Sequence, residues 1–164
     1  MFNSICASID KLDKEPWSLV SEELREKGLK SDQIERLADF VIGLKEDQDY
    51  DKVLFKLHAM LGHSHQVLTE MSLLKEYLDA MNISHHVKID TSLARGLDYY
   101  TGMIFEAVIS GGDEAKLGLG SIAAGGRYDN LIGKFSKDTI PSAGGSLGIE
   151  RIFNILEQRE QKNI

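Results

Sequence analysis

The stretch SLARGLDYYTGMIFEAVIS, residues 92–110, places several chemically active side chains at the start of an apolar segment. Arg95 lies among small residues, and an aspartate and two tyrosines follow it within five positions. The dense apolar residues of 102–110 predict a strand, and the alternation of apolar and polar residues over 86–93 predicts another. The sequence therefore places an arginine, an aspartate and two tyrosines at a bend between two strands.

Glycine and charge separate the chain into two kinds of sequence. Residues 1–90 hold 3 of the 15 glycines and residues 91–164 hold 12, so tight turns concentrate in the second half. The net charge is −7, of which −6 comes from residues 1–90 (11 basic and 17 acidic side chains) and −1 from residues 91–164 (8 and 9). Neither half has the basic surplus with which a protein holds nucleic acid by its phosphates alone.

The first half has helical periodicity throughout. Apolar residues recur every three or four positions from the N-terminus to the end of HQVLTEMSLLKEYLDAM, residues 65–81. Pro16 suits the first turn of one of these helices, Gly28 suits its end, and Ser31 suits the N-cap of the next. These segments predict a small helical module with short connections.

The second half predicts a small sheet with short helices. Strands are expected near 119–125 and 144–148, in addition to the two named above. RYDNLIGKF, residues 127–135, predicts a short helix, and GIERIFNILEQREQ, residues 148–161, predicts an amphipathic one. A helical module followed by antiparallel strands is an α+β arrangement.

The composition also bounds the environment of the protein. No apolar run approaches the roughly 18 to 20 residues of a membrane span, and the N-terminus has no signal-peptide pattern. Cys6 is the only cysteine, which excludes an intrachain disulfide and suits a reducing compartment. These features predict a cytoplasmic protein without a membrane segment.

Three segments combine glycine with arginine. Glycine lets the backbone approach a ligand closely, and a fixed guanidinium presents a planar fork to phosphate or carboxylate. Tyrosine packs on a flat ring and still donates or accepts a hydrogen bond. Together these residues suit an anionic ligand joined to a flat polar one, such as a nucleotide, although turn glycines, surface arginines and core tyrosines better explain any one segment alone. The segments are residues 95–102, 124–129 and 144–151.

The same segments resemble the histidyl-tRNA synthetases, which are class II aminoacyl-tRNA synthetases. LARGLDYYTG and AAGGRYDNLI resemble the two histidine-specific signatures of that family, in the order in which the family has them. GGSLGIERIFNIL resembles the third general class II motif, and the N-terminal SICASIDKLDK is similar to the eukaryotic cytosolic branch. The resemblance covers essentially the whole chain.

The resemblance implies a role for each matching residue. Arg95 matches the catalytic arginine that contacts the α-phosphate and the substrate carboxylate. Tyrosines of both signatures match the histidine pocket, and Arg151 matches the arginine that stacks on adenine and reaches the terminal phosphate. The implied histidine and adenylate site comprises Arg95, Tyr99, Tyr100, Gly125, Gly126 and Tyr128, and the implied ATP site comprises Arg95, Gly148 and Arg151.

The resemblance also implies a domain organisation and partners. Residues 1–14 are expected to lead from the catalytic domain into an insertion, 15–84 to form that helical insertion, and 85–164 to form the C-terminal half of the catalytic domain. The expected substrates are histidine, ATP with Mg²⁺, and tRNA(His). The full-length enzyme is expected to be a homodimer.

Other polar residues carry weaker predictions. Asp98 either orients a tyrosine or caps the bend. Glu106 and Glu150 are candidates for contact with Mg²⁺, although salt bridges with neighbours are the favoured interpretation. The histidines match no common metal-ligand spacing and Cys6 has no cysteine partner, so no metal site is predicted. These histidines are His58, His63, His65, His85 and His86.

The chain is expected to be part of a larger enzyme. No Phe-Arg-x-Glu pattern, which in the family marks the hairpin that holds ATP, precedes Ser4. The chain alone is therefore expected to be inactive or nearly so, and half a sheet predicts an open edge and an uncovered apolar face. The alternative is a stand-alone noncatalytic fragment or paralogue that acts as a binding or regulatory module. The intact arginine and tyrosine signatures favour the first interpretation.

Overall fold

The structure is a computed structural model of the chain, which divides into two compact units, Met1–Gly96 and Leu97–Ile164. No helix among the residues described is long and apolar enough to cross a membrane. The structure describes residues 2–45, 47, 49–62, 65–94, 99–111, 118, 120–134, 138 and 140–162.

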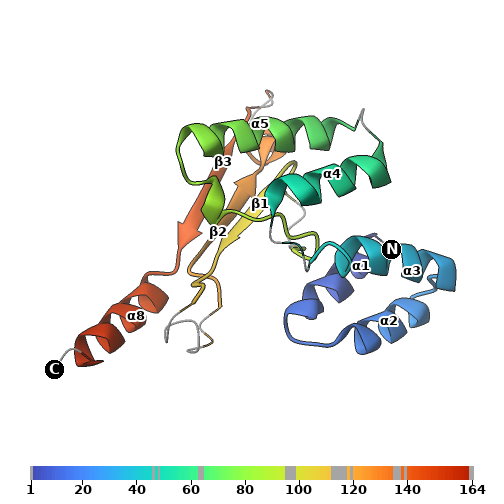
Figure 1. The fold of residues 1–164 in the computed structure, drawn as a ribbon, viewed down its shortest axis with the longest axis horizontal. Helices are drawn as coiled ribbons and strands as arrows, with labels where there is room; N and C mark the ends of the chain where they lie inside the picture. Colours follow the sequence, from blue (N-terminus) through green and yellow to red (C-terminus); the bar gives the residue numbers. More distant parts are fainter. Residues whose placement is uncertain are drawn as a thin grey trace. The chain divides into compact units, whose positions relative to one another are not determined.

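The first unit is helical, which confirms the interpretation of the periodicity. Helices α4 and α5 lie next to each other in this unit and are joined through Gly62, where the backbone adopts a φ of 86° (Figure 1). That left-handed conformation suits glycine and ends α4. The helices are α1 (Phe2–Ile9), α2 (Trp17–Glu26), α3 (Ser31–Val41), α4 (Tyr50–Leu61) and α5 (Gln66–Ala80), with 3₁₀ turns at Asp10–Asp13 and Ser84–His86.

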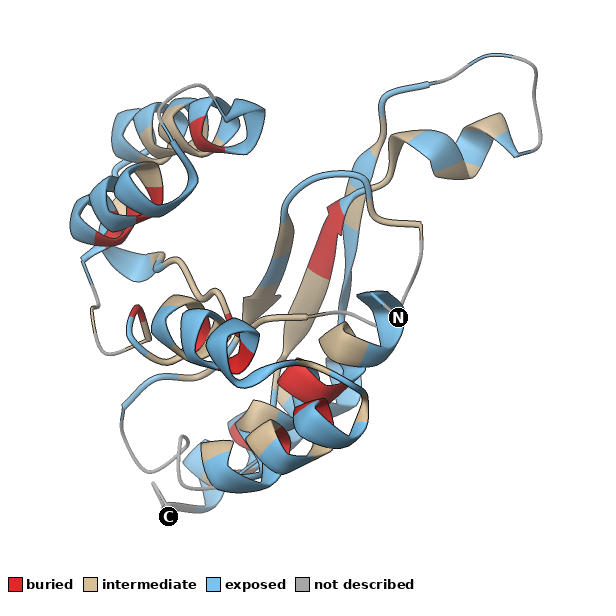
Figure 2. Cartoon of the chain, turned by 90° about the vertical axis from the view of Figure 1, so that its right-hand side faces the viewer, coloured by how far each residue is buried: buried red, intermediate tan, exposed pale blue. Residues whose placement is uncertain are grey.

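Two apolar clusters hold this unit together. Val20 and Leu24 of α2 lie four positions apart, on one side of the helix, and both are fully buried. They form one cluster with Ile34 of α3, which is 5% exposed. The second cluster is centred on α4 and the start of α5, where Val53 and Leu68 are each 1% exposed. In Figure 2 the buried residues of these helices are red, and they occupy only part of each helix surface.

An exposed ion-pair network joins the first two helical segments. Glu23 accepts hydrogen bonds from Lys11 and Lys27, each at 2.7 Å, and these bonds lower the pKa of Glu23 to about 2. Lys27 also donates to the Ser8 hydroxyl at 2.6 Å. Because water and salt reach these groups, the network contributes less to stability than the apolar clusters do.

The predicted N-cap of α3 is wrong by one residue. Lys30 occupies that position, in an extended conformation with φ −77° and ψ 158°, and Ser31 is the first helical residue. The backbone N–H of Lys30 donates to the side-chain Oε1 of Gln33 at 2.9 Å. A glutamine three residues into the helix therefore satisfies a donor at the helix start, as in one half of a capping box.

The predicted strand over 86–93 is also wrong, because residues 87–90 have no regular structure. Val87 and Ile89 pack against the α4–α5 cluster, and the Thr91 hydroxyl donates to the carbonyl of Phe40 at 2.7 Å. The alternation thus reflects packing on helices rather than strand pairing. The compact first unit accordingly extends beyond residue 85, whereas the assignment of 85–164 to a catalytic domain stays a prediction.

The second unit is an antiparallel sheet followed by a long helix, as Figure 1 shows. The strands have the order β1-β2-β3. The α+β arrangement and both predicted helices of this half are confirmed. The elements are β1 (Ile104–Ala107), β2 (Ala123–Arg127), α7 (Asp129–Gly133), β3 (Ala143–Leu147) and α8 (Ile149–Lys162).

The strand register sorts the residues of the sheet onto two faces. Phe105, Gly125 and Gly145 are opposite one another and share one face, because directly paired residues point the same way. The neighbouring row of Ile104, Gly126 and Gly144 shares the other face. The two glycines of β2 are its buried residues, and they are the red stretch on the middle strand in Figure 2.

Much of the apolar surface of the second unit is exposed. Leu147 is 69% exposed at the end of β3, and Ile149, Phe153 and Leu156 of α8 are 75%, 62% and 56% exposed. Ile155, on another side of α8, is 6% exposed. Most of these exposed apolar residues lie on α8, whereas the uncovered apolar face was predicted for the sheet.

Candidate functional site

Only part of the segment 92–102, which carries the predicted bend, lies within the described residues. Arg95 and Asp98 lie outside the described residues, so their predicted roles stay predictions. Tyr99 and Tyr100 are among the described residues, and Thr101 follows them toward β1. Thr101 donates its backbone N–H to the carbonyl of Arg127 at 2.9 Å, which holds this segment against the end of β2.

Three predicted tyrosines form one cluster at that end of the sheet. The ring centroids of Tyr99 and Tyr100 are 4.6 Å apart, and those of Tyr99 and Tyr128 are 6.1 Å apart in an edge-to-face arrangement. Tyr100 and Tyr128 are separated by 6.4 Å. All three are half-buried, a burial that leaves part of each ring accessible to a ligand. The structure thus brings together tyrosines from two segments more than twenty-five residues apart in the chain.

Glycine beneath these rings is a steric requirement. A Cβ atom at Gly126 would lie 2.9 Å from two carbon atoms of the Tyr100 ring, and one at Gly144 would overlap the Tyr128 hydroxyl. The two glycines are paired across β2 and β3, so they form a flat floor under both phenols. The chemical consequence is a shallow aromatic site with hydroxyl groups, suited to a flat polar ring.

Gly125 does not belong to that floor. Its Cβ would point to the opposite face, 2.8 Å from a carbon of the Phe105 ring and 2.6 Å from the Cα of Gly145. Phe105 therefore lies across Gly125 and Gly145, and the sheet has an aromatic ring on each face. Of the two glycines predicted for the histidine site, Gly125 and Gly126, only Gly126 lies on the face of the sheet that carries the tyrosines.

Asp129, which was not among the residues predicted from the sequence, connects the segments around the cluster. Asp129 accepts a hydrogen bond from the Arg127 Nε at 2.8 Å and another from the backbone N–H of Ser142 at 2.9 Å. Its own backbone N–H donates to the Thr101 hydroxyl at 3.0 Å. The Ser142 bond first, and then the Arg127 guanidinium, hold the pKa of Asp129 below its ordinary value.

Two of the predicted ATP residues, Gly148 and Arg151, lie toward the other end of β2. Gly148 donates its backbone N–H to the carbonyl of Ile122 at 2.7 Å. A guanidinium nitrogen of Arg151 donates to the carbonyl of Ser121. Tyr128 follows the last residue of β2, whereas Ser121 and Ile122 precede the first. A five-residue strand is about 16 Å long, so Arg151 and the tyrosines mark two separate places along the sheet.

The remaining acidic candidates are distributed over the second unit. Glu106 is paired with Ala124 in β1, on the face that carries the tyrosines, and is half-buried. Glu150 is exposed in the first turn of α8. Within the described part of the chain, no group of three or more histidine, cysteine, aspartate or glutamate side chains is arranged to hold a metal ion.

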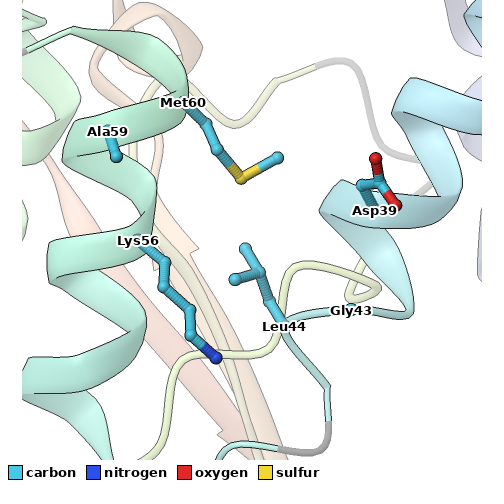
Figure 3. A pocket seen from close by; sticks show the side chains of 6 residues that line it. All are labelled: Asp39, Gly43, Leu44, Lys56, Ala59 and Met60. Carbon is cyan, nitrogen blue, oxygen red and sulfur yellow. The ribbon is translucent and has the colours of Figure 1, made fainter.

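A pocket of about 400 Å³ in the first unit contains none of the predicted residues. Met60 of α4 and Leu44, which follows α3, extend into it (Figure 3). Lys56 on its rim pairs with Asp47 at 3.2 Å, so this cation already has a partner. Asp39 is the other charged residue of the lining, and the remaining lining residues are glycine or apolar. None of these residues is aromatic, so the tyrosine cluster stays the better candidate site for a flat polar ring.

Comparison with a family model gives a match over residues 7–152, to the model described as histidyl-tRNA synthetase. The cytoplasmic histidine–tRNA ligase of Arabidopsis thaliana is 46% identical, over 98% of this chain and 18% of the relative. That of Dictyostelium discoideum is 42% identical, over 98% of this chain and 33% of the relative. The human mitochondrial histidine–tRNA ligase is 43% identical, over 96% of this chain and 33% of the relative.

Solved structures agree with the sequence relatives. The crystal structure of histidyl-tRNA synthetase from Nostoc sp. PCC 7120 matches with a TM-score of 0.80 and 30% identity, over 96% of this chain and 37% of that one. A structure from Bacillus halodurans C, titled as an ATP phosphoribosyltransferase regulatory subunit/histidyl-tRNA synthetase, matches at a TM-score of 0.71 and 22% identity and shows the fold alone. The chain spans between 18% and 33% of the length of these three curated relatives.

Proposed function

The chain belongs to the histidyl-tRNA synthetase family, and on this premise we propose that its tyrosine cluster binds the imidazole ring of histidine in a histidine–tRNA ligase. The observation that carries the proposal is the convergence of Tyr99, Tyr100 and Tyr128 over the Gly126–Gly144 floor. An imidazole is flat, with one donor and one acceptor in its neutral form. Phenol rings supply a packing surface, and phenol hydroxyls supply matching hydrogen bonds.

In the proposed reaction the chain provides part of the site for adenylate formation. The histidine carboxylate attacks the α-phosphorus of ATP, the bond from that phosphorus to the oxygen bridging the α- and β-phosphates breaks, and pyrophosphate leaves. Mg²⁺, when bound with ATP, would offset part of the phosphate charge. Arg95 neutralises the charge that builds on the α-phosphoryl oxygens. Arg151 and Gly148 contribute to the ATP end of the site, where a guanidinium can stack on adenine. Histidine is then transferred to the terminal adenosine of tRNA(His), within a homodimer of the full-length enzyme.

We expect loss of a single phenol hydroxyl to weaken histidine selectively. Tyr99→Phe, Tyr100→Phe and Tyr128→Phe are introduced one at a time. The protein assayed is a histidine–tRNA ligase that has the full length of the relatives and contains this sequence. At least one substitution is expected to raise the KM for histidine about tenfold or more, because an imidazole nitrogen loses its partner in a partly desolvated site. The KM for ATP should change less than about twofold, because ATP is bound mainly by other residues. Steady-state kinetics with each substrate varied separately measure both effects.

Tyr77→Phe is the matched control for these substitutions. Tyr77 is 60% exposed on α5, in the other unit, so removal of its hydroxyl should leave both KM values unchanged. The proposal is wrong if all three cluster variants keep the histidine KM of the unaltered enzyme.

The 164-residue chain alone is expected to catalyse almost no histidine-dependent ATP–pyrophosphate exchange. It spans 18% of the Arabidopsis relative and 33% of the Dictyostelium one, and phosphoryl transfer depends on several charged and positioning groups placed together around the phosphates. Exchange at a rate near that of a full-length relative would show that the chain holds a complete site. The assay measures radiolabelled ATP formed from pyrophosphate, with and without histidine.

We propose the cytoplasm as the place of this activity. The support is the single cysteine and the cytoplasmic relatives from Arabidopsis thaliana and Dictyostelium discoideum. Mitochondrial relatives at 43% identity are the competing comparison. Imaging of the tagged full-length protein, expressed from its own gene, tests the location.

A further inference from the structure

We propose that Asp129 is a positioning residue of the tyrosine cluster: it joins the segment that carries Tyr100 to the segments beside Tyr128 and Gly144, and so holds the phenol rings at their spacing. Its consequence for histidine rests on the proposed function, whereas its effect on the rings does not. Asp129 contacts neighbouring protein groups and acts through the tyrosines.

The two carboxylate oxygens of Asp129 have different partners. Oδ1 accepts from the backbone N–H of Ser142 at 2.9 Å, and Oδ2 accepts from the Arg127 Nε at 2.8 Å. A carboxylate offers only acceptors when it is ionised, and both of these donors need an acceptor. The side chain is 19% exposed, so most of its surface is enclosed by the groups it joins.

The backbone of Asp129 forms a hydrogen bond with a third segment, the one that contains Tyr100 and Thr101. Its N–H donates to the hydroxyl of Thr101 at 3.0 Å, and Thr101 directly follows Tyr100. Thr101 in turn donates its backbone N–H to the carbonyl of Arg127 at 2.9 Å. The chain on one side of the cluster is therefore bonded to both residues that flank Tyr128.

The Ser142 bond completes the connection to the glycine floor. Tyr128 donates its backbone N–H to the Ser142 carbonyl at 2.8 Å, while Ser142 donates its own N–H to Asp129. Ser142 lies two residues before Gly144, whose missing side chain leaves room for the Tyr128 hydroxyl. Loss of the carboxylate would release the Arg127 and Ser142 donors together, while the backbone bonds to Thr101 and Ser142 would remain. The phenols would then lose the side-chain part of the connection that sets their spacing.

The first test uses the 164-residue chain with ¹³C-labelled tyrosine rings and NMR. Asp129→Ala is expected to remove the ring-to-ring contacts of Tyr128 with Tyr99 and Tyr100. The backbone amide signals of β1 and β2 should keep the chemical shifts of the folded chain. Asp129→Asn keeps an acceptor for Ser142 but offers an amide NH₂ to Arg127, so it should weaken those contacts less. Glu157→Ala, an exposed carboxylate on α8 in the same unit, is the control and should change none of them.

Two results would overturn the inference. One is an Asp129→Ala chain whose tyrosine contacts are those of the unaltered protein. The other is loss of the contacts only together with loss of the sheet signals, which would make the residue merely structural. If Asp129→Ala does not fold, Asp129→Asn and Arg127→Met decide between these outcomes, because each removes a single bond of the carboxylate.

The second test measures kinetics in the full-length enzyme. Asp129→Ala should raise the KM for histidine about tenfold, a factor that corresponds to roughly 1.4 kcal/mol, and leave the KM for ATP within about twofold. Simple destabilisation would lower the amount of active enzyme and therefore kcat, without moving the histidine KM. If the tyrosine variants raise the histidine KM and Asp129→Ala does not, the inference fails and the proposed function stands. If the tyrosine variants have no effect, the proposed function fails, and the NMR result still decides the role of Asp129.

Discussion

Replacing Arg95 by alanine in the full-length enzyme is expected to lower the rate of histidyl-adenylate formation about 10²- to 10³-fold. Negative charge builds on the phosphoryl oxygens as the histidine carboxylate attacks, and a fixed guanidinium stabilises that charge more in the transition state than in the ground state. The affinity for histidine should fall far less, because the tyrosine cluster supplies most of its contacts in the proposal. Arg95 lies outside the described residues, so its role rests on the resemblance of LARGLDYYTG to the family signature.

Single-turnover formation of the adenylate and equilibrium binding of histidine separate the two effects. Arg95→Lys keeps the charge but loses the planar fork, and it should recover only part of the rate. Arg36→Ala, an exposed arginine on α3, is the control and should leave the rate unchanged. Equal losses of rate and of histidine affinity would argue against a role in the transition state.

The elements that could be predicted from the sequence are those with a strong local period. The amphipathic pattern of Ile149, Ile152, Phe153 and Leu156 gives α8, and the glycine-rich runs that precede it give β2 and β3 within a few residues. Residues 86–93 have an equally clear alternation but do not form a strand. Val87 and Ile89 bury their side chains against helices, and a strand also needs a hydrogen-bonded neighbour, which local sequence does not reveal.

The candidate site shows the same division between local and non-local information. The family signatures identified Tyr99, Tyr100 and Tyr128, and the structure brings them together. Asp129 was missed, because its significance comes from Thr101 and Ser142, which lie far from it in the sequence. The sequence does show a polar residue next to each tyrosine. Which of these polar residues bonds to which segment depends on the register of the strands, which the sequence does not give.

Gly125→Ala is expected to have the largest effect on stability among the glycine substitutions of the sheet. Its methyl group would overlap the carbonyl oxygen of Gly144 and approach the Cα of Gly145 to 2.6 Å. These are backbone atoms of the neighbouring strand, which cannot rotate away as a side chain can. Overpacking of this kind costs about 1–3 kcal/mol and sometimes more, a large share of the roughly 5–15 kcal/mol that stabilises a typical domain. The unfolding midpoint in urea, followed by the NMR signals of β2 and β3, measures the loss.

Gly144→Ala provides the contrast, because its methyl group would overlap only the hydroxyl end of the Tyr128 side chain. The ring can shift, so the urea midpoint should fall less than in Gly125→Ala, while the histidine KM of the full-length enzyme rises. Gly148→Ala is the control for stability, since its nearest neighbours would be 3.4 Å away, an ordinary contact. If Gly125→Ala unfolds at the same urea concentration as Gly148→Ala, the two strands are not in the close contact on which the glycine floor and the tyrosine site both depend.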